Sequence, residues 1–451
     1  MYPTPHETRL CRFPYICGVR TKATRSELGT RRQRTIVVET VPAARAGYRA
    51  RVRGRSVTAL WIAIFVVAFG TNVPTPLLLI YRTELGLSST ALTGAFAVYA
   101  AGLVPALLLA GPASDRFGRR QVVVPFVVLS VLTSLLFLGA GSSVLLLFVC
   151  RFLQGAVSGV VFSVGTAWLG ELVGADALLS AEAQDSTAPA RAARLTTAAL
   201  GGGWAIGPLA SGLLAQWAPW PTVLPYLVHV ALMIVGLVLL PRVPETLAAG
   251  DRRVGAWLNL GVPAAARWPF ALVVLPVAVG VFTFPSTAVT VLPLLLTPTM
   301  PQIAVAITGF VAGVTLLTGV FAQPLGRRLG AVTAGPVGLA VGACGLGLSL
   351  LGVGLNSWPL LIPVALLLGV GYGLCLAAGL TMVGELASAR HRGALTGTFY
   401  ACAYLGFGVP LLLSVAGGGR FLVPLTVLAI VTAVVAVTLM LPVSRRLIGQ
   451  T

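Results

Sequence analysis

The sequence predicts an all-α membrane protein with twelve transmembrane helices, arranged as two related six-helix bundles. The chain is 57% hydrophobic, and only 10% of its 451 residues are charged. A soluble domain has about a quarter of its residues charged, so this chain lacks the polar surface that contact with water requires. Apolar segments long enough to cross a bilayer also recur along the chain, and most of its outer surface is therefore expected to face lipid.

Twelve apolar segments follow residue 55, each close to the roughly 20 residues that a helix needs to cross the hydrocarbon core. The first six fall at 57–81, 92–113, 121–141, 144–170, 196–216 and 221–242. The other six fall at 269–296, 303–324, 331–353, 358–384, 394–416 and 420–441. We therefore expect a basic N-terminal tail (1–55), a first bundle (56–242), a linker (243–268), a second bundle (269–443) and a short C-terminal tail (444–451).

Basic residues outnumber acidic residues by 31 to 12, and their placement predicts the orientation. Beyond residue 55, fifteen arginines fall at one end of the spans and only Arg82 and Arg420 at the other. Because Lys and Arg gather on the cytoplasmic side of membrane proteins, we expect both termini in the cytoplasm. The same placement makes nucleic acid an unexpected partner.

Residues 1–55 carry thirteen of the basic residues and contain no apolar segment of the signal-peptide type. They are interpreted as a basic tail that touches anionic lipid headgroups, as a disordered tail, or as upstream sequence that is not translated. The intact mass of the purified protein distinguishes these cases. All basic residues but Lys22 are Arg. This bias is typical of a G+C-rich bacterial genome, so we expect the cytoplasmic (inner) membrane of a bacterium.

Two sequence matches relate the halves. Gly-Pro-Ala-Ser-Asp-Arg-Phe-Gly (111–118) aligns with Gln-Pro-Leu-Gly-Arg-Arg-Leu-Gly (323–330) at an offset of 212, and Gly-Glu-Leu (170–172) aligns with Gly-Glu-Leu (384–386) at an offset of 214. Each pair falls at the same end of the equivalent span. Parallel six-span repeats related by an axis along the membrane normal are an established plan among transporters.

The loop after the second span, residues 111–120, carries the most specific motif. Gly111 and Gly118 permit a tight turn between closely approaching helix ends, and Asp115 can lie against a helix N-terminus, where negative charge is favoured. Arg119 can pair with Glu171 at the end of the fourth span. A positively charged anchor on the cytoplasmic side is the simpler interpretation of the same residues.

This loop resembles the signature loop of the major facilitator superfamily, G-x-L-A-D-R-x-G-R-R/K, with Ala113 in place of Leu. The resemblance implies that the cluster holds the two halves together in one conformational state and releases them in the other. The residues concerned are Gly111, Asp115, Arg116, Gly118, Arg119, Arg120 and Glu171. Arg327, Arg328 and Glu385 form a weaker copy in the second half, where Arg327 occupies the position of Asp115.

Arg151 lies within the fourth span, where a charge costs at least about 2.5–3.5 kcal/mol at the bilayer centre, so it should face a cavity or a partner. With Gln154, Gly155 and Gly159 it resembles a second motif of the superfamily, R-x-x-Q-G-x-x-x-G. The resemblance implies a role for Arg151 in proton coupling or substrate contact. The alternative is a structural arginine bonded to backbone carbonyls, and the two glycines favour close helix packing.

The fifth span carries Gly203, Gly207, Pro208 and Gly212, which resemble the antiporter motif of twelve-helix drug exporters, G-x8-G-x3-G-P-x2-G-G. Ser211 and Arg194 replace two of the motif's glycines. Pro208 removes a helical hydrogen bond and is expected to kink the span. The resemblance favours export, and an ordinary kinked helix is the alternative.

None of the twelve acidic residues falls in the middle of a span, so the proton coupling that the resemblance implies has no obvious carboxylate. His229 in the sixth span is a titratable candidate, although a lone histidine on an apolar helix is more often packed and hydrogen-bonded. The family's central path runs between spans 1, 4, 7 and 10, where Asn72, Arg151, Gln154 and Tyr372 are candidates. An apolar lining with one positive charge favours a hydrophobic or amphipathic substrate, since a sugar needs more polar partners.

Together the resemblance implies a secondary active transporter that works by alternating access, exports small hydrophobic or amphipathic molecules and exchanges them for protons. A facilitator or a proton-coupled importer of a small metabolite is one alternative. A receptor or scaffold that keeps the fold without transport is another. We expect no cofactor, no metal and no catalysis, because the histidines form no recognisable acid–base arrangement. We also expect a monomer whose partners are its substrate and membrane lipid.

Overall fold

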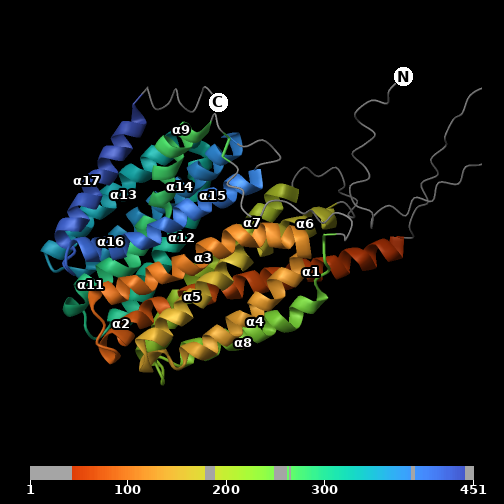
Figure 1. Cartoon of the computed structure of the whole chain (residues 1–451), viewed down its shortest axis with the longest axis horizontal. Helices are drawn as coiled ribbons and strands as arrows, with labels where there is room; N and C mark the ends of the chain where they lie inside the picture. The colour runs from red at the N-terminus through yellow and green to blue at the C-terminus, as the bar shows by residue number, and fades with distance from the viewer. Residues whose placement is uncertain (1–42, 178–187, 248–261, 264–265, 387–391, 442–451) are drawn as a thin grey trace, which may run out of the picture.

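The computed structural model describes residues 43–177, 188–247, 262–263, 266–386 and 392–441. Within these residues, twelve helical stretches are long and apolar enough to cross a membrane, which confirms the predicted all-α, twelve-span fold. Figure 1 shows them as two packed groups of long helices. Residues 1–42 of the predicted N-terminal tail (1–55), the predicted C-terminal tail (444–451) and most of the predicted linker (243–268) lie outside the described residues. Residues 43–55 of the predicted tail are helical and form the start of α1, which the polar sequence did not lead us to expect.

The first bundle contains spans 1 to 6. Span 1 is formed by α1 (Ala43–Asn72) and α2 (Pro74–Glu84), and spans 2 and 3 by α3 (Ser89–Phe117) and α4 (Arg119–Phe137). Span 4 joins α5 (Val144–Val160), η3 (Val161–Gly165) and α6 (Thr166–Ala177). Spans 5 and 6 are α7 (Ala188–Trp217) and α8 (Leu224–Leu239). The helix of span 5 thus begins well before the predicted boundary at 196, because a helix can extend out of the bilayer into polar sequence.

The second bundle contains spans 7 to 12. Span 7 joins α9 (Arg267–Pro269), η7 (Phe270–Val274), α10 (Leu275–Ser286), η8 (Thr287–Val291) and α11 (Leu292–Leu296). Spans 8, 9 and 10 are α12 (Ala304–Leu329), α13 (Ala331–Gly354) and α14 (Leu361–Leu386). Span 11 joins α15 (Arg392–Tyr404), η11 (Leu405–Gly408) and α16 (Val409–Ala416), and span 12 is α17 (Leu422–Met440).

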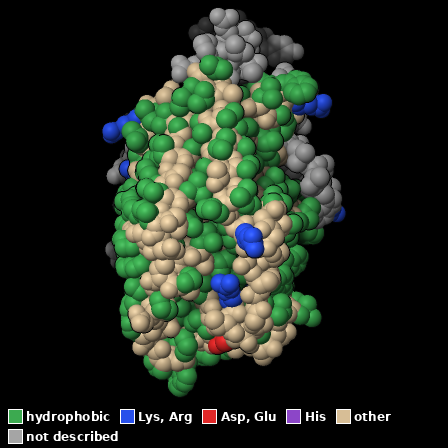
Figure 2. Space-filling view, turned by 90° about the vertical axis from the view of Figure 1, so that its left-hand side faces the viewer, with side chains coloured by type: hydrophobic (Ala, Val, Ile, Leu, Met, Phe, Trp, Pro, Cys, Tyr) green, Lys and Arg blue, Asp and Glu red, His purple; other side chains and the backbone are tan. Residues whose placement is uncertain are grey.

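The outer surface is apolar, as a lipid-facing surface must be. Side chains of α17 such as Val423, Ile430 and Val437 are 72%, 58% and 60% exposed. The face drawn in Figure 2 is dominated by hydrophobic side chains, with few charged groups on it. Water would make such a surface unstable, so the molecule is a multi-pass membrane protein.

Equivalent positions in the two halves adopt the same local structure, which supports the sequence repeat. Thr71 donates its hydroxyl hydrogen to the carbonyl of Val67 at 3.0 Å, and Thr283 donates to that of Val279 at 2.8 Å. Thr71 and Thr283 are 212 positions apart, and so are Val67 and Val279, which is the offset found between the loops. The repeat therefore extends from the loops into the middle of spans 1 and 7.

We call the end of the molecule that holds the α3–α4 turn the loop end, and the end that holds the α2–α3 turn the far end. Direct hydrogen bonds join the two bundles at the far end. The hydroxyl oxygens of Thr90 and Ser414 lie 2.9 Å apart, and the side-chain amide of Gln216 donates to the carbonyl of Gln302 at 2.8 Å. In Figure 1 this end, with α2 and α11, lies at the lower left.

Candidate functional site

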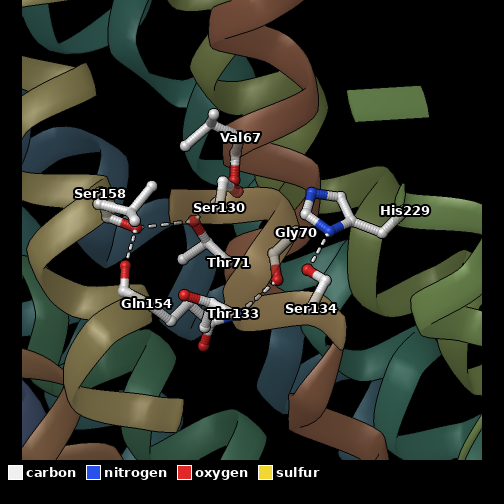
Figure 3. A pocket seen from close by; sticks show the side chains of 10 residues that line it. Val67, Gly70, Thr71, Ser130, Thr133, Ser134, Gln154, Ser158 and His229 are labelled. Atoms are coloured by element: carbon white, nitrogen blue, oxygen red, sulfur yellow. Dashed lines mark hydrogen bonds between the residues drawn. The ribbon is translucent and has the colours of Figure 1, made fainter. Parts of the chain in front are cut away.

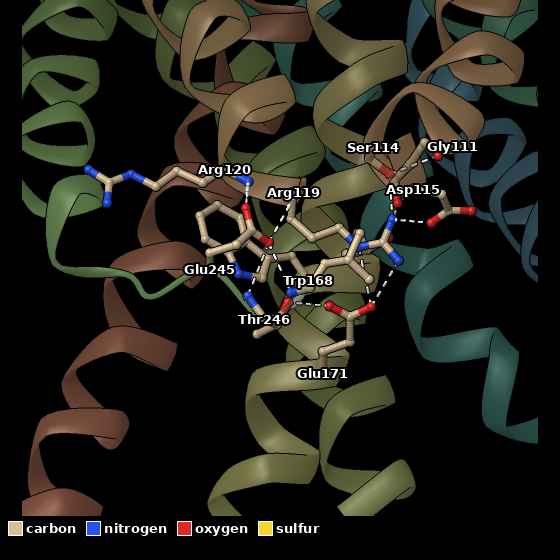
Figure 4. Close-up of polar contacts among 12 residues, drawn as sticks. Gly111, Ser114, Asp115, Arg119, Arg120, Trp168, Glu171, Glu245 and Thr246 are labelled. Carbon is tan, nitrogen blue, oxygen red and sulfur yellow. Dashed lines mark hydrogen bonds and ion pairs between the residues drawn. The ribbon is translucent and has the colours of Figure 1, made fainter. Parts of the chain in front are cut away.

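At the loop end, Arg119 is the centre of a charged cluster (Figure 4). Its Nη1 donates to Asp115 Oδ1 at 2.7 Å, and its Nη2 and Nε donate to Glu171 Oε1 at 3.0 and 3.2 Å. It also donates to the hydroxyl of Ser114. The Arg119 side chain is only 13% exposed, so these charge-assisted bonds are partly shielded from water. They fasten the C-terminal end of α3 and the start of α4 to α6.

Glu245, from the segment after span 6, occupies the N-terminus of α4. Its two carboxylate oxygens accept hydrogen bonds from the backbone N–H groups of Arg119 at 3.1 Å and Arg120 at 2.9 Å. A helix N-terminus has unpaired N–H groups and a partial positive charge, so a carboxylate is favoured there. Thr246 donates to Glu171, and the Trp168 indole donates to the carbonyl of Pro244 at 3.0 Å. The start of the linker is therefore part of the cluster.

We define the loop cluster as Ser114, Asp115, Arg119, Glu171 and Glu245. The sequence placed Asp115 at a helix N-terminus, but Glu245 takes that position and Asp115 binds Arg119 instead. Gly118 has a φ of 106° and makes the expected turn. Gly111 lies inside α3, and an added Cβ there would meet nothing within 4 Å, so the close approach expected at Gly111 is not made.

The described contacts of Arg119 and Glu245 all join elements of the first bundle, whereas the resemblance implied a connection between the halves. Arg116 and Arg120 have exposed side chains beside the cluster. The copy in the second half differs. Arg327, Arg328 and Glu385 are exposed, and none of them forms an ion pair with another described residue.

A second site lies between the bundles, where aromatic rings from both halves meet. Trp204 of α7 contacts Phe282 of α10 with ring centroids 6.2 Å apart, and Tyr99 of α3 contacts Phe407 of η11 at 5.6 Å. Phe282 in turn stacks on Tyr404 at 4.5 Å. We call these five residues the aromatic bridge. It is continuous from one bundle to the other.

The aromatic bridge lines a small central cavity. Its other lining residues are Thr71, Asn72, Pro285, Ser286, Val289, Ala312 and Leu316. None of the lining residues carries a charge. The cavity volume is about 20 Å³, far below the roughly 300–1,000 Å³ of sites that hold drug-sized ligands. The rings must therefore separate before a ligand of that size can enter.

Arg151 lies behind this cavity rather than in its wall. It is 2% exposed, and its Cζ lies 4.9 Å from the ring centre of Tyr99 and 5.1 Å from that of Phe96. Its Nε donates to the carbonyl of Ala95 at 3.1 Å and its Nη1 to Gln154 Oε1 at 2.7 Å. The positive charge expected in the lining is thus absent from it in this conformation. The bonds match the structural alternative for Arg151.

Near the cavity, three prolines leave helical carbonyl groups without the N–H donor four residues later. Polar side chains of other spans donate hydrogen bonds to these carbonyls. Proline cannot donate to the carbonyl four residues earlier in a helix. Pro74, Pro208 and Pro410 thus leave the carbonyls of Gly70, Trp204 and Gly406 available, and these accept hydrogen bonds from Gln154 at 2.7 Å, Asn72 at 3.4 Å and Ser286 at 3.0 Å, respectively. The kinks and the polar side chains are therefore structurally linked.

The glycines of span 5 contact two different partners. A Cβ at Gly203 or Gly207 would collide with the backbone of Phe65 or Phe69 in α1. A Cβ at Gly212 would come within 3.0 Å of Gly309 in α12, across the boundary between the bundles. Gly155 and Gly159 likewise allow α5 to lie directly against the backbone of α3, as expected for small residues on one helix face.

The remaining predicted residues fall near the cavity without lining it. The Tyr372 ring lies 6.0 Å from that of Phe282 and is buried against Gly319. His229 lies inside the first bundle and bonds to Ser134 and to the carbonyl of Val66. The sequence missed Glu245, Thr246 and Phe407. For Glu245 and Thr246, the only indication in the sequence was an acidic residue and a threonine directly after the sixth span. No motif pointed to Phe407.

Comparison with known proteins identifies the family. The profile of the Major Facilitator Superfamily matches residues 60–342, well over half of the chain. The chain belongs to this superfamily. The Puromycin resistance protein pur8 of Streptomyces alboniger is 33% identical over 208 residues, which is 46% of this chain and 37% of that protein. The Multidrug resistance protein MdtL of Escherichia coli O157:H7 (strain EC4115 / EHEC) is 41% identical over 86 residues, which is 19% and 22%. The chain thus matches less than half the length of either relative.

Solved structures of other transporters share the fold of this chain over most of its length. A mutant of the peptide transporter POT in complex with alafosfalin gives a TM-score of 0.69 at 15% identity, covering 87% of this chain and 94% of that one. A POT family transporter in complex with 5-aminolevulinic acid gives 0.67 at 14% identity, covering 86% and 95%. At such identities the structural similarity establishes the fold and does not identify the substrate of this chain.

Proposed function

We propose that this protein is a secondary active transporter that exports small hydrophobic or amphipathic molecules across a bacterial cytoplasmic membrane by alternating access, in exchange for protons, with both termini in the cytoplasm. The observation that carries the proposal is the aromatic bridge. It lies at the boundary of the two bundles, where a ligand contacts both halves at once. The names of the relatives, a puromycin resistance protein and a multidrug resistance protein, favour export.

The lining of the central cavity favours flat, apolar ligands that are neutral. Aromatic side chains offer large contact areas at little loss of conformational entropy, and each well-placed ring contact contributes about 0.5–1.5 kcal/mol beyond area burial. The polar groups in the wall are few, and they include Thr71, Asn72 and Ser286. A sugar would leave most of its hydroxyls without partners here. A polycation would find no carboxylate.

The far end provides the gate in this proposal. Thr90 bonds to Ser414, and Gln216 bonds to Gln302 and to the backbone N–H of Ala306, so the bundles are connected on that side of the cavity. Export requires these contacts to break when a ligand leaves at the far end. They are neutral hydrogen bonds, each with a net contribution of only about 0.5–1.5 kcal/mol, so ligand binding can supply the energy needed.

The ligand test uses purified protein in proteoliposomes with two probes, the neutral dye N-phenyl-1-naphthylamine and puromycin, driven by a pH gradient. We expect saturable transport, and Phe282→Ala should raise the KM about tenfold through lost ring contacts. Phe310→Ala, at an exposed position on α12, is the matched control and should transport normally. Equal KM values for the two variants would contradict the assignment of the cavity.

The gating test replaces the hydroxyl pair at the far end with Thr90→Cys and Ser414→Cys. Because the oxygen atoms lie 2.9 Å apart, the two sulfur atoms are within reach of a disulfide. Oxidation should stop transport and a reductant should restore it, while each single Cys variant stays active. Unchanged flux through the cross-linked protein would exclude alternating access at this gate. A receptor or scaffold would show no flux in any variant.

A further inference from the structure

A second, polar cavity lies wholly inside the first bundle, between spans 1, 3, 4 and 6 (Figure 3). Its volume is about 10 Å³, close to the space that one water molecule needs. Five Ser and Thr residues, the Gln154 amide and the His229 imidazole line it. A water molecule needs two to four polar partners to be held in a protein interior, and this cavity offers more than that.

Hydrogen bonds determine which nitrogen of His229 carries the hydrogen. His229 Nε2 lies 3.1 Å from the carbonyl oxygen of Val66, which can only accept, so Nε2 must be the donor. In a neutral imidazole Nδ1 is then the acceptor. The hydroxyl of Ser134 lies 2.7 Å from Nδ1 and donates to it. The free lone pair of the ring is thus directed at a hydroxyl in the cavity wall.

We propose that His229 carries the proton that this transporter exchanges for its substrate, with the polar cavity as the route to it. The inference rests on the proposed function, because it assigns the coupling group of the same cycle. The spans offer no carboxylate near their middle, and imidazole is the remaining side chain whose charge changes readily near neutral pH.

Both protonation states of His229 are hydrogen-bonded at this site. When a proton from the cavity binds Nδ1, Nε2–H continues to donate to Val66, and the hydroxyl of Ser134 rotates so that its oxygen accepts from Nδ1–H. The Ser134 hydrogen then points to a water in the cavity. Release reverses these steps, and no bond other than N–H and O–H hydrogen bonds changes.

Thr71 connects the polar cavity to the central cavity, because it lines both. Its hydroxyl lies 3.1 Å from that of Ser158, and the Ser158 hydroxyl also reaches the carbonyl of Gln154 at 2.9 Å. Hydroxyl groups and water can pass a proton between them, since each both donates and accepts. A proton that enters the central cavity thus has a short polar route to the imidazole.

The other titratable or charged groups around this route are few. Tyr226 on α8 bonds to Tyr81 of α2 at 3.3 Å, and Tyr99 of α3 lies beside Ser158 and Thr71. All three are aromatic hydroxyls that stay neutral near pH 7. From α4 only hydroxyl groups reach the cavity. Among the described residues around this route, Arg151 on α5 is the one fixed charge, and it is joined to the route through Gln154. Its charge opposes a second positive charge on His229, so removal of the charge should ease proton binding.

Gly70 makes room for the imidazole. A Cβ at this position would overlap three atoms of the His229 ring, so the ring lies against the bare backbone of α1 at the point where span 1 is kinked. Movement of span 1 during transport therefore acts directly on the imidazole and on its bond to Val66. This contact gives the proton site a mechanical connection to the wall of the central cavity, which α1 also provides.

The first test separates coupling from transport in proteoliposomes with N-phenyl-1-naphthylamine. His229→Gln keeps a donor for Val66 and an acceptor for Ser134 but cannot take up a proton. We expect loss of the pH-gradient-driven component, while gradient-free exchange of the dye persists. Ser134→Ala should reduce the driven component, and Ser349→Ala, a buried serine of α13 bonded only to its own helix, is the matched control.

The outcomes distinguish this inference from the proposed function. Driven transport by His229→Gln at the wild-type level overturns the role of His229 and leaves the transporter proposal intact. A wild-type protein that exchanges dye without any response to the gradient overturns proton coupling itself, and this inference with it.

The second test observes the imidazole without transport. The sequence has three histidines, so the double variant His6→Gln, His391→Gln leaves His229 as the sole imidazole for nitrogen NMR. We expect the Nε2–H tautomer at high pH and a proton on Nδ1 after acidification, at a higher pH in a variant that also carries Arg151→Gln. An imidazole that remains neutral throughout the pH range in which the protein is folded would refute the proposal.

Discussion

The loop between spans 2 and 3 and its copy between spans 8 and 9 have the same backbone turn but different chemistry. Gly118 and Gly330, 212 positions apart, have φ values of 106° and 76° and ψ values of 154° and 159°, a region open almost only to glycine. Arg119 holds Asp115 and Glu171, whereas its equivalent in the second half is Ala331.

The difference shows that the repeat preserves the backbone turn but not the ion pairs of the loop cluster. A tight turn is needed wherever two adjacent spans meet at this end. The ion pairs are needed only where the turn must also be fastened to other elements, here to α6 and to the start of the linker through Glu245. Among the described residues, the first bundle thus has a loop end reinforced by ion pairs, and the second has a plain loop without them.

Arg119→Ala should have the largest effect. It removes charge-assisted bonds to Ser114, Asp115 and Glu171, and we expect the free energy of unfolding to fall by about 2–3 kcal/mol. Transport should fall with it. Thermal unfolding in detergent and dye flux measure the two effects. Arg327→Ala is the control from the plain loop, and an equal loss there would remove the asymmetry.

Glycine replacements should affect both loops alike. Gly118→Ala and Gly330→Ala each force a Cβ into a backbone region that is essentially restricted to glycine, which costs about 1–3 kcal/mol. We expect similar drops in thermal stability for the two variants, because the turns are equivalent. Gly111→Ala, where an added Cβ meets open space, is the control and should unfold at the same temperature as the wild type or slightly above it. A harmless change at Gly330 alone would mean that the second turn can relax.

Glu245→Gln tests the helix cap. Loss of the carboxylate charge at the N-terminus of α4 should cost about 0.5–1 kcal/mol, because the helix dipole and two N–H groups favour an anion there. The exposed Glu385→Gln in the second half should leave thermal stability unchanged. If high salt abolished the difference in stability between wild type and Glu245→Gln, the carboxylate would act through long-range electrostatics that salt screens, rather than through its direct hydrogen bonds to the N-terminus of α4.

Asp115→Asn should have the smallest effect on stability. Its side chain is 52% exposed, and an exposed ion pair contributes about 0.2–1 kcal/mol. Any loss of transport that greatly exceeds this small change in stability would place Asp115 in the conformational cycle. Parallel measurement of flux and unfolding in the same variant makes the comparison. Arg328→Ala in the second loop should change neither quantity.

The sequence was sufficient for the spans, because twelve apolar segments leave little freedom in a bilayer. It was also sufficient for the meeting of Arg119 with Glu171, since opposite charges at neighbouring helix ends have few other partners. Glu245 could not be assigned to the α4 N-terminus, because the position of the linker depends on how span 6 packs. The lining of the central cavity was predicted only in part. Asn72 lines the cavity as expected, whereas Arg151, Gln154 and Tyr372 do not, because their positions depend on how the spans pack and rotate.

The three proline-dependent hydrogen bonds bear on how this sequence can diverge. A residue with an N–H in place of Pro208 would donate to the Trp204 carbonyl and straighten the helix there, so it would compete with the amide of Asn72 for that acceptor. Pro74 and Gln154 are related in the same way through the Gly70 carbonyl, and Pro410 and Ser286 through the Gly406 carbonyl, although the N–H groups of Val73 and Val409 already donate to these two carbonyls. Substitutions at these pairs are therefore expected to be epistatic. A change at the proline that is harmful by itself becomes tolerable once its distant partner has become apolar, so the pairs should be gained and lost together in evolution.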